Sequence, residues 1–145
     1  IELHENGLDI QFRIRENGVV ELADFSSQEV KKAPMEPKED ICYPAVEIHR
    51  SGTGSLNMHA YKNNINQSSV DFVYENHELK EQEGGKELEI VMVSPEKLKA
   101  VYHMRLFDGV PAVQTWTEII NEGSEEQGLT YVSSFMYQGI SRGGE

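Results

Sequence analysis

The chain reads AVYHMRLFDGVPAVQTWTEI from Ala100 to Ile119. Apolar side chains occupy every second position from residue 100 to residue 106, and a second alternating run begins at Val113. A period of two is typical of a β-strand that buries one of its faces. Between the two runs, Asp108-Gly109 and Pro111 have the chemistry of a turn. The stretch therefore predicts two successive long strands of an antiparallel sheet.

The same alternation extends through most of the chain. Asp9–Arg15 has an apolar face and a polar face, and Asn17-Gly18 after it is a strong hairpin signal because both residues tolerate positive φ. Val19–Phe25 is then the expected partner strand. Further strands are predicted over Tyr43–Arg50, the alternating positions from Val70 to Glu75, Leu88–Met92 and Leu129–Gln138, with a turn at Gly84-Gly85.

Two longer connections separate these runs. Ser26–Asp40 has no clear period and contains two prolines, so we interpret it as a solvated connection. Ser51–Ser68 is rich in Gly, Ser and Asn and is longer than an ordinary connection. A single helical turn is expected within it, at Leu56–Lys62. Long loops in compact domains are often functional, which makes this loop the first place to look for a site.

About nine strands with few helices predict an all-β fold, and specifically an antiparallel β-sandwich. The strands expected between Lys86 and Gln138 are long, which favours a large sandwich. A chain of 145 residues suits one domain or part of a larger one, so we expect residues 1–145 to form a single domain. Ser141–Glu145 directly follows a strand pattern. We therefore expect a fragment of a longer multidomain chain, with an incomplete portion of the sandwich.

The formal net charge of −12 narrows the class of partner. Nucleic acids and anionic membrane surfaces both favour basic proteins, so neither is expected as a partner. An acidic surface is compatible with neutral ligands such as sugars. The longest purely apolar run is Ile90–Val93, far short of the roughly 20 residues of a membrane span. The single cysteine, Cys42, excludes an internal disulfide and favours a cytoplasmic location, although an exported protein without disulfides stays open.

Few residues have the spacing of a chemical site. The five histidines, at positions 4, 49, 59, 77 and 103, lack metal-binding spacings, so no metal and no cofactor are predicted. Ser133-Ser134 lacks the flanking glycines of a nucleophile elbow. Solvation accounts for the clustered acids, which lie in polar runs: Glu36, Glu39 and Asp40; Glu75, Glu78 and Glu81; Glu122, Glu125 and Glu126. We therefore predict no catalytic residue in this chain.

The order of motifs from Tyr102 to Ile140 is more informative than any single motif. An aromatic strand ends in Phe107-Asp108, an apolar strand carries Trp116, and Asn121-Glu122-Gly123 precedes a Ser-Ser-Phe strand that ends at Phe135. This order resembles the N-terminal supersandwich domain of family 36 glycoside hydrolases, which are chiefly α-galactosidases. The runs Pro44–Glu47 and Gly85–Ile90 fit the same resemblance.

The resemblance implies that this chain is the non-catalytic domain of a longer enzyme and that another domain carries out catalysis. In such enzymes a downstream catalytic barrel holds two aspartates of a retaining mechanism, which requires carboxylates about 5–5.5 Å apart. The motifs that carry those aspartates do not occur in this chain, so it is expected to be inactive alone. A loop of the N-terminal domain reaches towards the sugar pocket, and here the corresponding candidates for substrate binding are Asn57, His59 and Lys62. Asn57 stands where the family pattern has Asp; it retains hydrogen bonding but not the charge.

Several hypotheses stay open. The first is a scaffold domain that packs on the barrel, lends a loop to the α-galactoside pocket and helps to build a homo-oligomer interface. The second is a free-standing carbohydrate-binding module, for which Trp116 and the row Tyr131, Phe135 and Tyr137 are the candidate aromatic platform. A core or interface position is the alternative for Trp116, and a solvated polar loop is the alternative for residues 52–63. A purely structural or adhesive sandwich is the third hypothesis.

Overall fold

The computed structural model describes residues 1–29, 36–37, 42–53 and 67–137. Within them the chain forms nine strands and one short helix. These are β1 (Glu2–Glu5), β2 (Leu8–Ile14), β3 (Val20–Ser27), β4 (Ile48–Arg50), α1 (Gln67–Val70), β5 (Val73–Gln82), β6 (Gly85–Val93), β7 (Leu98–Phe107), β8 (Val110–Asn121) and β9 (Leu129–Val132). The helical turn predicted at Leu56–Lys62 lies outside the described residues.

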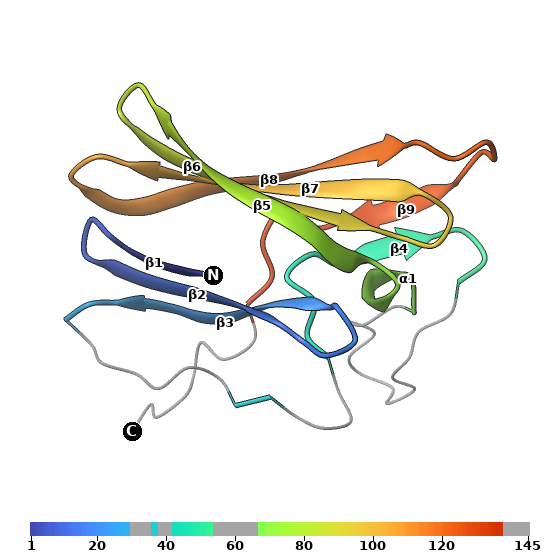
Figure 1. Ribbon diagram of the computed structural model, residues 1–145, viewed down its shortest axis with the longest axis horizontal. Helices are drawn as coiled ribbons and strands as arrows, with labels where there is room; N and C mark the ends of the chain where they lie inside the picture. Colours follow the sequence, from blue (N-terminus) through green and yellow to red (C-terminus); the bar gives the residue numbers. More distant parts are fainter. Residues whose placement is uncertain (30–35, 38–41, 54–66, 138–145) are drawn as a thin grey trace.

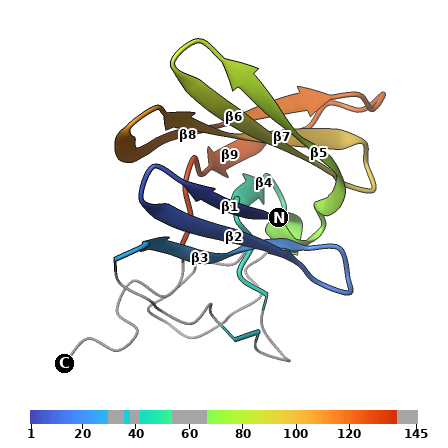
Figure 2. The same ribbon diagram turned by 60° about the vertical axis from the view of Figure 1, so that its left-hand side comes forward.

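The strands form two main layers, as Figure 1 shows. One layer is a three-stranded sheet in the order β1-β2-β3, and the other is a four-stranded sheet in the order β5-β6-β7-β8. A two-stranded sheet of β4 and β9 lies at one end, between the levels of the two larger sheets (Figures 1 and 2). Every pairing is antiparallel. The prediction of an all-β antiparallel sandwich is confirmed.

The hydrophobic core lies between the two layers. Phe12 of β2 meets Tyr102 of β7 edge to face, with ring centroids 5.7 Å apart, and both side chains are almost fully buried. Burial raises the pKa of the Tyr102 hydroxyl above its ordinary value, because the ionised form would lose its hydration. The alternating residues of β6 and β7 complete this face: Leu88, Ile90, Met92, Ala100, Met104 and Leu106. The faces predicted from the period of two are thus the observed ones.

The hairpin between β2 and β3 is confirmed, with a different turn from the one that Asn17-Gly18 predicts. The amide of Gly18 donates to the carbonyl of Arg15, and the amide of Arg15 donates to the carbonyl of Val19. Only Gly18 has positive φ, at 84°, whereas a two-residue turn would need it at both central positions. A Cβ on Gly18 would lie 2.8 Å from Cβ of Val73, so glycine also allows the hairpin to approach β5.

The meander β5-β6-β7-β8 follows the predicted order, with bulges that adjust the register. The register shifts near Tyr74 in β5 and again between Leu106 and Phe107 in β7. A Cβ on Gly85 would lie 1.9 Å from the carbonyl oxygen of Leu106, so only glycine permits β6 to approach β7 there. Pro111 lies within β8 rather than in the turn, and this edge strand tolerates its missing N–H group.

Some predicted boundaries are wrong. Val70 belongs to the short helix α1, and β5 begins only at Val73. The last strand ends at Val132, and the strand predicted at Tyr43–Arg50 is reduced to β4. At α1 the hydroxyls of Ser68 and Ser69 bond the carbonyl of Ile48 in place of a strand ladder. The first strand, β1, was not among the predicted elements.

The segment after β9 joins the two layers on one side. The amide of Ser133 donates to the carbonyl of Glu47 at 2.8 Å, and the Ser133 hydroxyl accepts from the Glu47 amide at 2.7 Å. Further along, Phe135 meets Phe25 of β3 edge to face, with centroids 5.4 Å apart. Figure 2 shows this segment descending from β9 towards β3. No helix among the described residues is long and apolar enough to cross a membrane.

Candidate functional site

The loop predicted to carry the site is described only at its two ends. The candidates Asn57, His59 and Lys62 lie outside the described residues. One end of the loop follows β4 as Ser51–Thr53, and the other enters α1 at Gln67. The side chains that hold these two ends fix where the loop leaves the fold and where it returns. We call this group of side chains the base of the candidate site.

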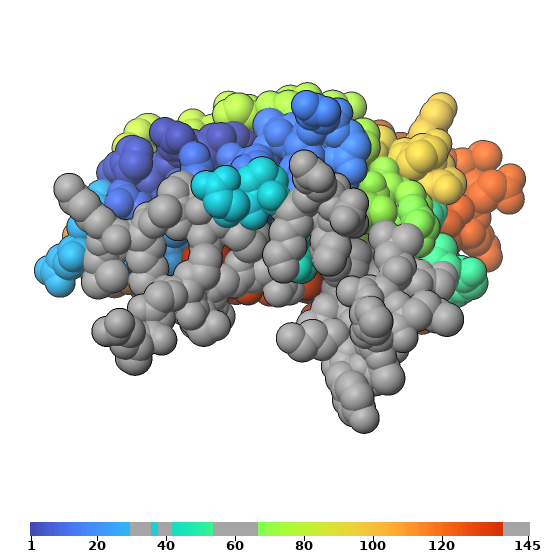
Figure 3. All heavy atoms as spheres, turned by 90° about the horizontal axis from the view of Figure 1, so that it is seen from below, coloured from blue at the N-terminus to red at the C-terminus, as the bar shows by residue number. Residues whose placement is uncertain are grey.

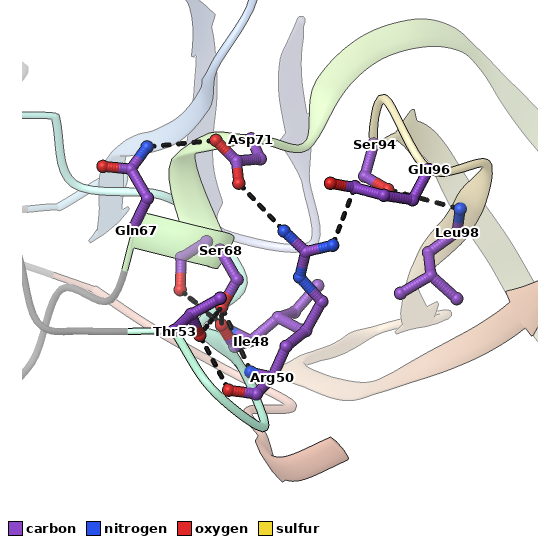
Figure 4. Close-up of polar contacts among 10 residues, drawn as sticks. Ile48, Arg50, Thr53, Gln67, Ser68, Asp71, Ser94, Glu96 and Leu98 are labelled. Carbon is purple, nitrogen blue, oxygen red and sulfur yellow. Dashed lines mark hydrogen bonds and ion pairs between the residues drawn. The ribbon is translucent and has the colours of Figure 1, made fainter. Parts of the chain in front are cut away.

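Arg50, the last residue of β4, is the centre of this base. Its guanidinium bonds Asp71 at 3.0 Å through Nη2 and Glu96 at 2.7 Å through Nη1, as Figure 4 shows. Its side chain is 8% exposed, whereas the two carboxylates are 26% and 43% exposed. Asp71 follows α1 and Glu96 lies in the turn between β6 and β7. Arg50 therefore joins three segments that are distant in the sequence.

Figure 3 shows the same neighbourhood from below. Along the long axis the blue of the β2–β3 hairpin is followed by the green of α1 and β5, and then by the yellow of the β6–β7 turn. The green and yellow segments lie side by side, in agreement with the ion pairs that Arg50 makes to both of them. The base of the loop is thus built against the edge of the four-stranded sheet.

Buried hydroxyl groups hold the two ends of the loop together. Ser68 donates to the carbonyl of Ile48 at 2.6 Å and accepts from the amide of Arg50 at 3.2 Å. Ser69 accepts from the amide of Ile48 at 2.9 Å, and Thr53 donates to the carbonyl of Arg50 at 2.7 Å. Since α1 is only four residues long, these side-chain bonds rather than helix length position it.

The charge of Glu96 depends on this arrangement. Burial raises the pKa of its carboxyl group, but hydrogen bonds from its own backbone amide, from Arg50 and from Ser94 lower it by more. The pKa therefore lies below its ordinary value of 4.5. The Nε atom of Arg50 is buried without a hydrogen-bond partner among the described residues. The cluster is a charged joint at the base of the loop.

A second polar cluster lies on the outer face of the four-stranded sheet. His103 of β7 stands opposite Glu89 of β6, and its Nδ1 atom is 2.9 Å from Glu87 and 3.8 Å from Glu89. Glu87 and His103 are both buried, at 7% exposed, although they face away from the core. In the described part of the chain these three residues are the group whose ligand atoms could hold a metal ion, lying within 4.8 Å of one another.

Trp116 of β8 closes one side of this cluster. Its ring stacks on the His103 ring with centroids 4.6 Å apart and an angle of 5° between the planes. Trp116 is half-buried, so the expected core position is wrong, whereas an interface role stays a prediction. Glu118, two residues further along β8, places a carboxylate oxygen 3.8 Å from Nε2 of His103.

The aromatic residues proposed as one platform do not form a single stacked row. Trp116 stacks on His103, and Tyr131 lies against His49 at 5.1 Å between centroids. Phe135 and Tyr137 both pack on Phe25. Tyr131 and Phe135 are nevertheless 50% and 40% exposed. The rings therefore occupy three separate contacts.

Sequence reasoning identified the exposed acids better than the buried ones. Glu75, Glu78, Glu81, Glu122, Glu125 and Glu126 are exposed, as predicted. The buried carboxylates of Glu21, Glu47 and Glu87 were not singled out. Glu21 is fully buried and bonds Arg15 and the amide of Tyr43. The signal was the presence of an acid inside a run of apolar residues, as at Val20–Leu22.

Cys42 is half-buried, and the side-chain amide of Asn17 donates to its sulfur at 3.4 Å. This contact of the thiol is thus to an amide group and not to a base. No protein-family model matches the chain, and no curated protein matches it either.

Proposed function

We propose that this chain is the non-catalytic N-terminal β-sandwich domain of an α-galactosidase. The observation that carries the proposal is the order of strands and turns from Pro44 to Phe135, in which an aromatic strand, an Asp-Gly turn, a Trp strand and an Asn-Glu-Gly turn succeed one another. The two-layer antiparallel fold has the architecture that the resemblance implies. Fold alone does not define function, so the order of motifs carries more weight than the architecture.

In this proposal the domain packs on a downstream catalytic barrel of the same parent chain. It lends the loop with Asn57, His59 and Lys62 to the rim of the sugar pocket. The joint around Arg50 supports this role, because it fixes the positions from which the loop leaves the fold and to which it returns. The parent enzyme hydrolyses an α-galactoside with retention of configuration, and the barrel supplies both carboxylates.

The proposal also covers the cofactor requirement, the oligomeric state and the cellular location of the enzyme. The domain needs no cofactor for its role. A homo-oligomer of the parent would use sheet surface of this domain in the interface. The acidic surface and the single half-buried cysteine support a cytoplasmic enzyme whose partner is a neutral sugar.

Activity of the parent protein tests this proposal. The chain alone is expected to give no turnover of a chromogenic α-galactoside, whereas the parent, extended through its barrel, is active. In the parent, His59→Ala and Lys62→Ala should raise KM by about tenfold, as expected when a charged hydrogen bond to substrate is lost. Asn66→Ala, in the same loop but outside the candidate set, is the matched control. Hydrolysis by residues 1–145 alone, or a parent without a barrel, would overturn the proposal.

A free-standing carbohydrate-binding module is the second candidate. The exposure of Tyr131 and Phe135 favours it, since exposed aromatic faces stack on sugar rings. Calorimetry of the isolated chain with galactose and raffinose-type sugars tests it. Heat of binding that disappears in Tyr131→Ala but persists in Glu126→Gln would support the hypothesis of a carbohydrate-binding module. No heat of binding at millimolar sugar would contradict that hypothesis. A structural or adhesive sandwich predicts neither sugar binding nor a downstream barrel.

A further inference from the structure

The outer face of β5–β8 carries ligating side chains that the proposed function does not use. Glu87 and Glu89 of β6 point to the same side of the sheet, and β7 presents His103 directly opposite Glu89 and diagonal to Glu87. One oxygen of each carboxylate and the Nδ1 atom of His103 lie within 4.8 Å of one another. An imidazole nitrogen with carboxylate oxygens is a ligand set that suits Zn²⁺ and similar divalent ions.

Both carboxylates are held by groups outside the ligand set. The side-chain amide of Gln82 donates to Oε2 of Glu87 at 2.8 Å, and the ammonium group of Lys80 contacts Oε2 of Glu89 at 2.6 Å. The other oxygen of each carboxylate, Oε1, faces Nδ1 of His103. Ligating carboxylates are commonly oriented by such outer hydrogen bonds. The three ligand atoms therefore converge on one point without any rearrangement of the strands.

The spacing of the ligand atoms fits a small ion. Bonds of about 2.0–2.1 Å from Zn²⁺ in tetrahedral geometry place neighbouring ligand atoms about 3.3 Å apart. The distances from Nδ1 are 2.9 Å to Glu87 and 3.8 Å to Glu89, which lie on either side of that value. Glu89 is 23% exposed, so a water molecule has access to the fourth position.

The second nitrogen of His103 gives an independent indication. The side chain is 8% exposed, and Nε2 is buried without a hydrogen-bond partner among the described residues. A carboxylate oxygen of Glu118 lies 3.8 Å from Nε2, and a carboxylate accepts but does not donate. When Nδ1 binds a metal, Nε2 carries the hydrogen and points to an acceptor, the arrangement that usually orients a ligating histidine.

We propose that Glu87, Glu89 and His103 form a binding site for Zn²⁺ or a closely similar divalent transition-metal ion. Glu118, with a carboxylate oxygen 3.8 Å from Nε2, is the nearby group that can move closer to accept the Nε2 hydrogen, and the stacked ring of Trp116 covers one face of the imidazole. The ion ties β6 to β7 on the face opposite the core and compensates the excess of carboxylates there. The site does not depend on the α-galactosidase proposal.

Titration of the chain with ZnCl₂ after removal of metal by a chelator tests the site. A Cys42→Ser background removes the thiol as a competing ligand. Calorimetry should show one ion per chain, and added Zn²⁺ should raise the midpoint of thermal unfolding. His103→Gln and Glu89→Gln should each weaken binding by at least about tenfold, and Gln82→Ala by about tenfold through the outer hydrogen bond.

Glu78→Gln is the matched control, because Glu78 stands opposite Glu89 in β5, faces the same side and is 67% exposed. The affinity of the Glu78→Gln variant for Zn²⁺ should equal that of the unsubstituted chain in the same Cys42→Ser background. Nitrogen-15 spectra of the imidazole rings should show the ion on Nδ1 of His103, rather than on the exposed rings of His4 or His77. No binding, or binding that survives His103→Gln and Glu89→Gln unchanged, would overturn the proposal.

Discussion

Arg50 and His103 are two buried basic side chains placed among carboxylates, and they act differently. Each is 8% exposed. Arg50 bonds carboxylates from two segments distant in the chain, and its permanent positive charge offsets one of their two negative charges. His103 faces carboxylates from its immediate neighbours in one sheet, and three of them, Glu87, Glu89 and Glu118, lie within 4.0 Å of one imidazole. The first arrangement joins parts of the fold, whereas the second leaves acceptor groups available to an ion.

Substitution of Arg50 should give the largest effect, since it breaks the joint and leaves two carboxylates without their partner. Arg50→Met is expected to lower the free energy of unfolding by about 2–3 kcal/mol, below the full value for a buried pair because Asp71 and Glu96 are partly exposed. Urea unfolding measures it. Arg105→Met, a half-buried arginine on the outer face, is the control and should cost less than about 1 kcal/mol. Equal losses in the two variants would show that the ion pairs of Arg50 contribute no more than the contacts of an ordinary half-buried arginine.

Substitution of Trp116 tests how much the His103 cluster contributes to stability. Trp116→Leu removes the ring that stacks on His103 and should lower the free energy of unfolding by about 1 kcal/mol, the size of an aromatic stacking term. The metal-free protein is the right sample, because an ion would add its own stabilisation. Gln114→Ala, exposed on the same strand and the same face, is the control. A Trp116→Leu variant as stable as this control would show that the stack contributes nothing.

The pH dependence of the Arg50 joint should give the smallest effect. The folded-state pKa of Glu96 lies below its ordinary value of 4.5, so its contribution to stability is present above that pH. The contribution is lost as the pH falls through the folded-state value. Because the carboxylate is 43% exposed, we expect less than about 1 kcal/mol. Denaturant unfolding of the protein and of Glu96→Gln should differ at neutral pH and converge in acid.

Glu126→Gln, an exposed carboxylate, is the control for this comparison. The difference in free energy of unfolding between Glu126→Gln and the unsubstituted chain should not depend on pH in the same range. A Glu96→Gln variant whose difference grew in acid would contradict the assignment of the lowered pKa to the Arg50 joint.

The two clusters also differ in how far sequence could predict them. The period of two correctly assigned Glu87, Glu89 and His103 to the face opposite the core. The period of two could not predict which residues these side chains contact. A tight turn at Asp108-Gly109 continued without a shift would pair His103 with Gln114, but the irregularity after Leu106 moves the partner to Trp116. A shift by two residues keeps every side chain on its face while changing what it touches.

The Arg50 joint had no comparable signal. Arg50, Asp71 and Glu96 are separated by 21 and 25 residues, and nothing local to any of them requires the other two. Their meeting depends on α1 and on the β6–β7 turn lying together at one edge of the sheet. The short helix itself was missed because the hydroxyls of Ser68 and Ser69 bond β4, a contact of tertiary origin.

By itself the sequence determined the class of fold, the inward and outward faces of the long strands and the sites of the main turns. Those features follow from local rules, namely the alternation of side chains along a strand and the φ values that glycine permits. Only the tertiary structure decided the register across bulges, the placement of α1 and the burial of charged groups away from the core. These depend on contacts between distant segments, and the packing and burial of such contacts can outweigh local preferences.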